Sequence, residues 1–336
     1  MNLRKLAGLF SAVFAIAMLA SLAAAQRNDY RIGAPVTYKN LTIFLIHGKD
    51  QATKNPILTL QEAMAQKVFI VYETSNVNEL AVENISKEFD VFIQSGDIVK
   101  GGKQDRIFSV SVVVPARSGR VLIDSFCVES GRWQKRGGED SDKFTSSNDR
   151  VVTRDLKIAA NSERSQQEVW EKVSEAQAKL AKNVGGTVTS GVSRSSLQLS
   201  LEDKKVVSTI DEYVRKLKPV IDGQSDVIGC AFAVNGKINS ADIYLTNNLF
   251  RKLWPKMIKA TATEAVSESN KGTSSVIVKA DSVKGFMDQA ENAASKEEKV
   301  AAGSRTKTRE DKDNVMFEAR DERTKVVVHR SFVKKD

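Results

Sequence analysis

Histidine, cysteine and proline are scarce in this 336-residue sequence, with 2, 2 and 5 copies. Structural zinc and iron–sulfur sites take three or four ligands from cysteine and histidine, so the sequence predicts no metal and no cofactor. No apolar run beyond residue 25 is long enough to cross a bilayer as a helix, which excludes a multi-pass membrane protein. The hydrophobic fraction of 41% suffices for a core, so a wholly disordered chain is not expected.

The first 25 residues have the three zones of a signal peptide. Arg4 and Lys5 precede an apolar stretch over residues 6–22, and three alanines end at Ala25, before the polar residue Gln26. This order predicts cleavage after Ala25 and release into the periplasm or the medium. No cysteine follows the apolar stretch, so no lipid anchor is expected.

The chain is basic, with a formal net charge of +9 that the loss of Arg4 and Lys5 lowers to +7. A positive field attracts anions, so weak contact with an anionic membrane surface is one expectation. Residues 296–299 and 309–313 alternate in sign, which is typical of a solvated face and not of a groove that follows phosphates. Nucleic acid is therefore not the expected partner, and the oligomeric state stays open.

Between residues 40 and 128 the hydrophobic residues follow a period of two, and turn residues separate the runs. This pattern predicts antiparallel strands over residues 41–47, 68–72, 90–94, 107–114 and 121–128. In the fourth strand Ser109 and Ser111 alternate with hydrophobic residues, which predicts one buried face. A short helix is predicted over residues 58–65. The sequence thus predicts an α+β fold with a β-sandwich-like N-terminal half, followed by helices and a β-hairpin.

After residue 138 the period becomes helical. Ser165 and Glu168 have the spacing of a capping box, and a helix of roughly four to five turns is expected behind them. A second helix is predicted from about Glu202, and a third contains Pro255, which we expect to bend it. Between these two helices, Asn235-Gly236 predicts a tight hairpin that joins strands 227–234 and 237–244.

These patterns define the expected domain limits. A main domain covers residues 40–268, after an N-terminal extension over residues 26–39. Beyond the main domain, the sequence favours a charged linker over residues 269–314 and a β-hairpin tail over residues 315–336.

Two motifs resemble catalytic loops but lack a required residue. His47-Gly48 follows an apolar strand like the oxyanion turn of an α/β-hydrolase, yet no serine has the flanking glycines of that fold's nucleophile elbow. Gly101-Gly102-Lys103 resembles a P-loop, but Gln104 stands where serine or threonine is required. Neither enzyme class is predicted, and residues 101–103 are expected to form a hairpin turn.

Two polar segments at predicted strand ends carry the candidate ligand-binding residues. Their guanidinium, ammonium and amide donors, beside backbone amides, suit a small anionic or sugar-like ligand. The candidates are Lys103, Gln104, Arg106, Cys127, Glu129, Arg132 and Trp133.

Other interpretations of the second segment stay open. Cys127 and Glu129 have the chemistry of a hydrolase nucleophile and carboxylate, with an arginine that lowers the thiol pKa. A structural interpretation instead pairs Glu129 with Arg132 and places Trp133 over the sheet edge. Cys127 and Cys230 either form a disulfide in an oxidising compartment or stay buried as separate thiols.

The sequence resembles a bacterial family, the ARG and rhodanese-phosphatase-superfamily-associated protein domain, in which ARG denotes ADP-ribosylglycohydrolase. The resemblance rests on residues 101–106 (GGKQDR), 127–133 (CVESGRW) and 167–170 (QEVW), together with a late hairpin and a helix that carries Trp254. It covers residues 40–268. It implies an ADP-ribose-like or phosphorylated ligand and no particular reaction.

We therefore expect an exported, noncatalytic binding or scaffold protein for a small anionic, sugar-like or ADP-ribose-like ligand. A hydrolase that uses Cys127 and Glu129 is one alternative, and an envelope-associated structural protein is another. Whether the protein is an enzyme stays open.

Overall fold

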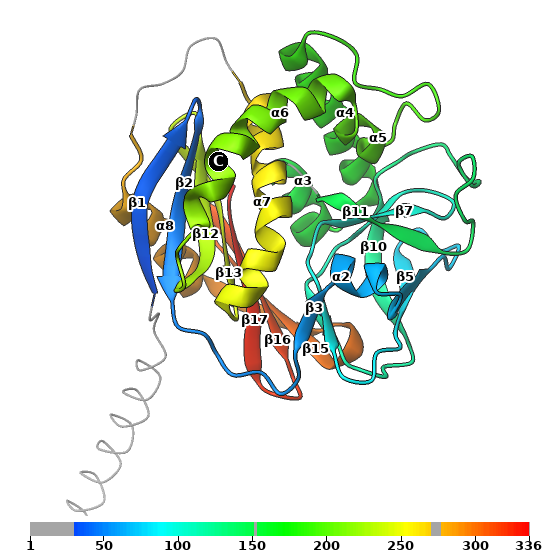
Figure 1. The fold of residues 1–336 in the computed structure, drawn as a ribbon, viewed down its shortest axis with the longest axis horizontal. Coiled ribbons are helices and arrows are strands. Elements are labelled where there is room, and N and C mark those ends of the chain that lie inside the picture. Colours follow the sequence, from blue (N-terminus) through cyan, green and yellow to red (C-terminus); the bar gives the residue numbers. More distant parts are fainter. Residues whose placement is uncertain (1–29, 151–152, 270–276, 336) are drawn as a thin grey trace, which may run out of the picture. The chain divides into compact units, whose positions relative to one another are not determined.

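The computed structural model describes residues 30–150, 153–269 and 277–335 (Figure 1). The predicted signal peptide and its cleavage site lie outside these residues. The chain from Ile32 onward forms one compact unit. No helix in the described part of the chain is both long and apolar enough to span a membrane.

Most strands lie in the N-terminal half and at the C-terminal end, and most helices lie between them. The strands are β1 (Tyr30–Tyr38), β2 (Leu41–Gly48), β3 (Ile57–Thr59), β4 (Phe69–Tyr72), β5 (Glu79–Asn84), β6 (Asp90–Ile93), β7 (Asp97–Gly101), β8 (Arg106–Phe108), β9 (Val112–Val114), β10 (Arg120–Cys127), β11 (Phe144–Arg150), β12 (Val227–Val234), β13 (Lys237–Tyr244), β14 (Ala294–Lys299), β15 (Ser304–Glu310), β16 (Asn314–Asp321) and β17 (Val326–Lys334). The helices are α2 (Leu60–Ala65), α3 (Arg154–Ile158), α4 (Gln166–Val184), α5 (Leu197–Leu201), α6 (Lys204–Leu217), α7 (Asn247–Ser267) and α8 (Ala280–Asn292). A π-helical turn, Ala159–Glu163, extends α3.

The described strands form three sheets. The largest has the order β1-β2-β12-β13-β17-β16-β15-β14, the second has the order β11-β7-β8-β10-β5-β4, and the third has the order β3-β6-β9. The pairing of β3 with β6 is parallel, whereas β10 with β5, β12 with β13, β13 with β17 and β16 with β17 pair in antiparallel fashion. The α+β class, with a strand-rich N-terminal half, is therefore confirmed.

Two helices cover the largest sheet at different strands. Helix α7 packs on β12, whose residues are buried at every position, and α8 packs on β15, β16 and β17. The ring of Phe286 on α8 lies 6.4 Å from the ring of Phe332 on β17. Successive residues of a strand point to opposite faces, so His329 and Ser331 face away from α8. Their face of the sheet borders the site described below.

The hairpin and the main helices follow their sequence signals. Strands β12 and β13 have the predicted bounds, and Asn235 and Gly236 have φ of 52° and 73°, as a tight hairpin turn requires. The Ser165 side chain accepts a hydrogen bond from the amide of Glu168 at the start of α4. Helix α7 runs through Pro255.

The single strand predicted over residues 107–114 is wrong. The chain leaves β8 after Phe108 and enters β9 at Val112, and these two strands belong to different sheets. The break is held by Ser109, whose amide and hydroxyl both donate to the carbonyl of Asp124, at 3.0 and 3.1 Å. Ser111 therefore lies in an irregular segment between two sheets.

The charged linker predicted over residues 269–314 is also wrong where the structure describes it. Residues 277–314 contain α8, β14 and β15, and the tail hairpin (β16 and β17) lies inside the largest sheet. The alternating charges pair across strands: Lys307 lies 3.1 Å from Glu297, at the sheet edge. Charged edge strands oppose pairing with another chain, so a charged run here marks an edge and not a linker.

Candidate functional site

The two polar segments selected from the sequence meet in the structure. Strand β8 pairs with β10, which sets Arg106 opposite Cys127. The turn before β8 brings Gln104 against the end of β10, where its side-chain amide donates to the carbonyl of Glu129 at 2.8 Å. Gly102 has φ of 54°, and a Cβ there would lie 2.4 Å from Phe144 and 2.8 Å from a carboxylate oxygen of Glu73. The turn therefore needs glycine for both conformation and space.

Three arginines and three carboxylates lie buried where the two segments meet. We call Glu73, Asp105, Arg106, Glu129, Arg132 and Arg136 the sealed network. The exposed fraction of each of the six side chains is 9% or less.

Each carboxylate of the sealed network has an arginine partner. Arg132 binds Glu129 through two hydrogen bonds of 2.7 Å, and Arg136 binds Asp105 through two of 2.8 and 3.0 Å. Arg106 lies 3.2 Å from Glu73. Although burial alone raises the pKa of Glu129, the hydrogen bonds from Arg132 and the Asp105 amide hold it below its usual value. Equal numbers of paired charges make this cluster a structural element. Of the nine nitrogens on its three arginine side chains, Nε of Arg106 is the one without an acceptor among the described residues.

The two cysteines are free and buried. Burial raises the pKa of the Cys127 thiol to about 11, and the opposing effect of Arg106 is smaller. Burial also raises the pKa of Cys230. A buried thiol with a raised pKa is a poor nucleophile, so the geometry does not favour the Cys127–Glu129 hydrolase.

Lys103 and Trp133 lie outside the sealed network, at its surface. The Lys103 ammonium donates to the Ser75 hydroxyl at 2.8 Å and lies 5.1 Å from the centre of the Trp133 ring, which is 48% exposed. Of the seven residues selected from the sequence, Trp133 is exposed, Lys103 and Arg132 are partly exposed, and the other four are buried.

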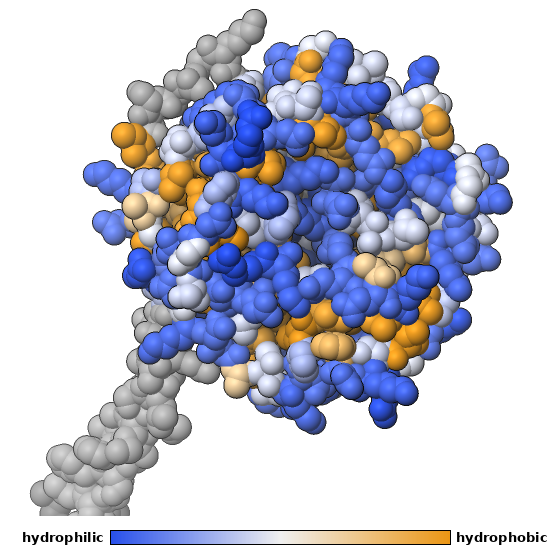
Figure 2. All heavy atoms as spheres, in the orientation of Figure 1, coloured by the Kyte–Doolittle hydropathy of each residue, from blue (hydrophilic) through white to orange (hydrophobic). Residues whose placement is uncertain are grey.

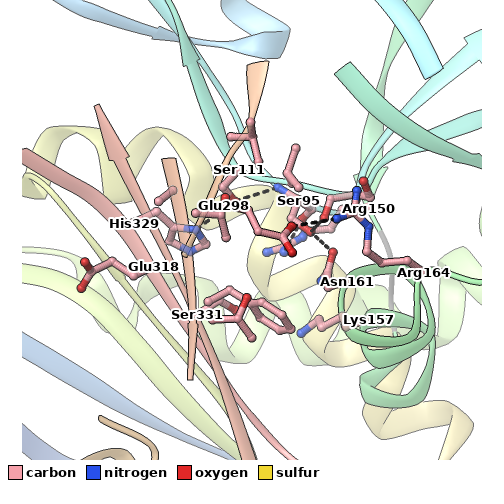
Figure 3. A pocket seen from close by; sticks show the side chains of 17 residues that line it. Ser95, Ser111, Arg150, Lys157, Asn161, Arg164, Glu298, Glu318, His329 and Ser331 are labelled. Atoms are coloured by element: carbon pink, nitrogen blue, oxygen red, sulfur yellow. Dashed lines mark hydrogen bonds and ion pairs between the residues drawn. The ribbon is translucent and has the colours of Figure 1, made fainter. Parts of the chain in front are cut away.

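A pocket that the sequence analysis missed lies elsewhere in the chain, against the largest sheet. Its lining comes from Ser95 and residues 109–111, from Arg150, Lys157, Asn161 and Arg164, and from strands β14 to β17. Figure 3 shows His329 and Glu318 on strands at one side, with Arg150, Lys157 and Arg164 at the other. The cavity volume is about 40 Å³, which is room for a few waters or one small oxyanion.

The mouth of the pocket continues into a larger depression, which we call the outer groove. The two share Asn161, Arg164, Glu298 and Thr308, and the outer groove has a volume of about 460 Å³. Arg164, at this boundary, pairs with Glu298 at 3.1 Å and with Asp124. In Figure 2 hydrophilic residues cover most of the face drawn, with hydrophobic residues in smaller groups.

Two buried cations line the pocket without an ion-pair partner among the described residues. Arg150 is 5% exposed; it donates to the carbonyl of Ser95 at 3.2 Å, and its Nε has no acceptor in the described part of the chain. Lys157 is 8% exposed, and its ammonium reaches the Ser240 hydroxyl at 3.4 Å. Burial and the nearby Arg150 lower the pKa of Lys157, and Asp242 and Glu264 offset only part of this effect. Neither carboxylate forms an ion pair with Arg150 or Lys157 among the described residues, so an anion between the two cations would add to this partial compensation.

The sequence gives little warning of this pocket. Lys157 stands in an otherwise apolar run, Leu156-Lys157-Ile158-Ala159-Ala160, and such a lysine is a signal of a buried cation. Arg150 ends a strand that the sequence pattern did not predict.

Comparison with known proteins places the chain in a family. The model of the ARG and Rhodanese-Phosphatase-superfamily-associated Protein domain matches residues 29–333. The chain belongs to this family. The match confirms the resemblance and extends it beyond residue 268, so that the helix α8 and the last four strands lie within the family domain. No curated protein and no solved structure matches the chain.

Proposed function

We propose that this member of the ARG and rhodanese-phosphatase-associated family is an exported binding protein for a small phosphate-bearing ligand. The supporting observation is the pair of buried cations, Arg150 and Lys157, that share one pocket and lack an ion-pair partner in the described chain. Isolated buried charges are costly, and a protein retains them where a ligand or partner compensates them.

The dimensions of the site support a ligand with one buried anionic group. The pocket of about 40 Å³ holds a group the size of phosphate, and the outer groove accommodates a sugar or a nucleoside attached to it. Asn161, Ser95 and Thr308 supply neutral hydrogen-bonding groups along this path. An ADP-ribose-like ligand has a phosphate group for the pocket and a sugar for the outer groove. The enzymes in the family's name supply a reason to test it.

Calorimetric titration of the purified protein with inorganic phosphate, ADP-ribose and ribose tests the proposal. We expect phosphate and ADP-ribose to bind and ribose to bind weakly or not at all. Lys157→Met should weaken the affinity for ADP-ribose about 10- to 100-fold, since it removes one charged hydrogen-bond donor.

Lys103→Met is the matched control, because it removes an ammonium from the surface selected by sequence. We expect its affinity to stay within about twofold of the wild type, which is under 0.5 kcal/mol. Equal affinities of wild type and Lys157→Met, or a larger loss in Lys103→Met, contradict the proposed pocket.

A further inference from the structure

A serine, a histidine and an aspartate form a continuous hydrogen-bonded chain at the wall of the same pocket. The Ser111 hydroxyl lies 3.1 Å from Nδ1 of His329, and Nε2 of that ring lies 3.0 Å from Oδ1 of Asp242. Ser111 and His329 line the pocket, whereas Asp242 lies behind the ring and is 3% exposed. The three residues come from separate segments; Ser111 and His329 are 218 positions apart.

The direction of the two hydrogen bonds follows from the charge on Asp242. Burial alone raises the pKa of Asp242, but the hydrogen bond from His329, together with Arg150 and Lys157, holds it well below its usual value. The ionised carboxylate can only accept, so Nε2 of His329 carries the hydrogen. In the neutral ring Nδ1 is then an acceptor, and it takes its hydrogen bond from the Ser111 hydroxyl.

Neighbouring rings fix the imidazole. Tyr244 stacks on His329 at a centroid distance of 4.7 Å and an angle of 16°, and Phe92 meets the ring at 5.8 Å and 72°. Tyr244 and Phe92 are therefore positioning residues for a base that cannot turn away from Ser111.

A second contact prepares the serine for charge. The amide of Ser95 donates to the Ser111 hydroxyl oxygen at 3.0 Å, and the carbonyl of Ser95 accepts from Arg150. A donor already aimed at the oxygen stabilises the alkoxide that develops when the proton leaves.

We propose that Ser111, His329 and Asp242 form a nucleophilic triad that hydrolyses small esters carrying an anionic group. The inference rests on the proposed function, because Arg150 and Lys157 would hold that anionic group beside Ser111. Serine, histidine and an ionised carboxylate in this order are the parts that acyl transfer requires, and the arrangement recurs on unrelated folds. The absence of a nucleophile elbow excludes the α/β-hydrolase fold and not this chemistry.

The reaction balances with ester and water as the only reactants. The Ser111 proton passes to Nδ1 of His329 as Oγ bonds to the carbonyl carbon. The carbon–oxygen bond to the alcohol then breaks, and the alcohol leaves with the proton from Nδ1. Water next gives a proton to Nδ1 and bonds to the acyl carbon, the bond to Oγ breaks, and Ser111 recovers its proton. Ester and water become acid and alcohol, while Asp242 remains ionised throughout.

The experiment combines a covalent probe with two esters. A fluorophosphonate should modify Ser111, with loss of fluoride and formation of an Oγ–phosphorus bond, and peptide mass spectrometry locates the label. 4-Nitrophenyl hemisuccinate should be cleaved faster than neutral 4-nitrophenyl acetate. Ser111→Ala and Asp242→Asn should each lower the rate by about a hundredfold or more.

Matched variants separate the triad from folding effects. Ser86→Ala changes a buried serine that does not line the pocket, and His47→Gln changes the other histidine, which pairs with Asp226 at 2.8 Å. Both should keep the wild-type rate. Phosphate should still raise the thermal midpoint of Ser111→Ala, which shows that the pocket is folded.

The outcomes distinguish this inference from the proposed function. Absence of label on Ser111, or equal ester hydrolysis by wild type and Ser111→Ala, overturns the triad even where phosphate binds normally. Labelling of Ser111 with loss of hydrolysis in Ser111→Ala supports the triad. If Ser111 is labelled and Ser111→Ala loses hydrolysis, but Lys157→Met binds phosphate like the wild type, the triad is supported and the anion-binding proposal fails.

Discussion

The sealed network and the pocket use similar residues in opposite ways. In the sealed network each of three carboxylates meets an arginine, and every arginine nitrogen except Nε of Arg106 donates to an acceptor within the protein. In the pocket Arg150 and Lys157 are as deeply buried, yet no carboxylate of the described chain pairs with them. A concentration of arginine in a sequence therefore does not identify a binding site. The proposed site rests instead on buried charges without an ion-pair partner, and coordinates are needed to find such charges.

Removing a carboxylate from the sealed network should give the largest change in stability. Glu129→Gln leaves three nearly buried arginines with two carboxylates, and Arg132 keeps only the longer pair with Asp105 at 3.8 Å, so we expect the free energy of unfolding to fall by about 3–5 kcal/mol. Urea denaturation measures the change. Glu268→Gln, at the exposed pair with Lys179, is the control and should cost less than about 1 kcal/mol. Equal small losses in both variants contradict the structural role of the network.

Cys127 should be protected from alkylation in the native protein. With a pKa of about 11, only about one thiol in a thousand is ionised at pH 8, and the group is also buried. Because the pKa is raised, the thiolate fraction grows tenfold with each pH unit up to that value. We expect iodoacetamide to react at least about a hundredfold more slowly than with the urea-unfolded chain. Rapid native labelling at Cys127 would restore the cysteine hydrolase as an interpretation.

Removing an unpaired cation should change stability in the opposite direction from the network variant. Lys157→Met replaces a buried charge by an apolar side chain of similar length, so we expect the protein in phosphate-free buffer to gain about 1–2 kcal/mol. Lys256→Met is the matched control, because its ammonium binds Asp97 at 2.8 Å and its loss leaves that carboxylate unpaired. A higher free energy of unfolding for Lys157→Met and a lower one for Lys256→Met would support the contrast between unpaired and paired buried cations. A lower value for both variants would contradict it.

The smallest effect is expected at the surface pair of Lys103 and Trp133. An exposed cation–π contact contributes roughly 0.5–1 kcal/mol, so Lys103→Met should lower the free energy of unfolding by no more than that. Chemical denaturation followed by Trp fluorescence measures it. A loss above about 2 kcal/mol would show that the turn at Lys103 helps to stabilise the sealed network.

Much of the fold is readable from local patterns, and the pocket is not. Asn235-Gly236 fixes a hairpin through backbone conformation, and Ser165 begins a helix through its side chain. Strand β14 carries charged residues at an exposed edge, so it has no hydrophobic period to detect. Arg106 and Cys127, both in segments selected from the sequence, are neighbours because adjacent strands carry them.

The charge balance around Arg106 and Cys127 depends on residues from other parts of the sequence. Glu73 and Arg136 complete the sealed network from outside the two quoted segments. The pocket likewise joins Ser111 to His329 across 218 positions and two sheets. Such juxtapositions arise from the way in which sheets pack, which no short motif encodes.

A crystal soaked in tungstate tests the central claim most directly, because the anion mimics phosphate and its anomalous scattering marks its position. We expect a peak between Arg150 and Lys157, and no peak there in crystals of Lys157→Met. A peak at the Lys103–Trp133 surface with none in the pocket would contradict the account.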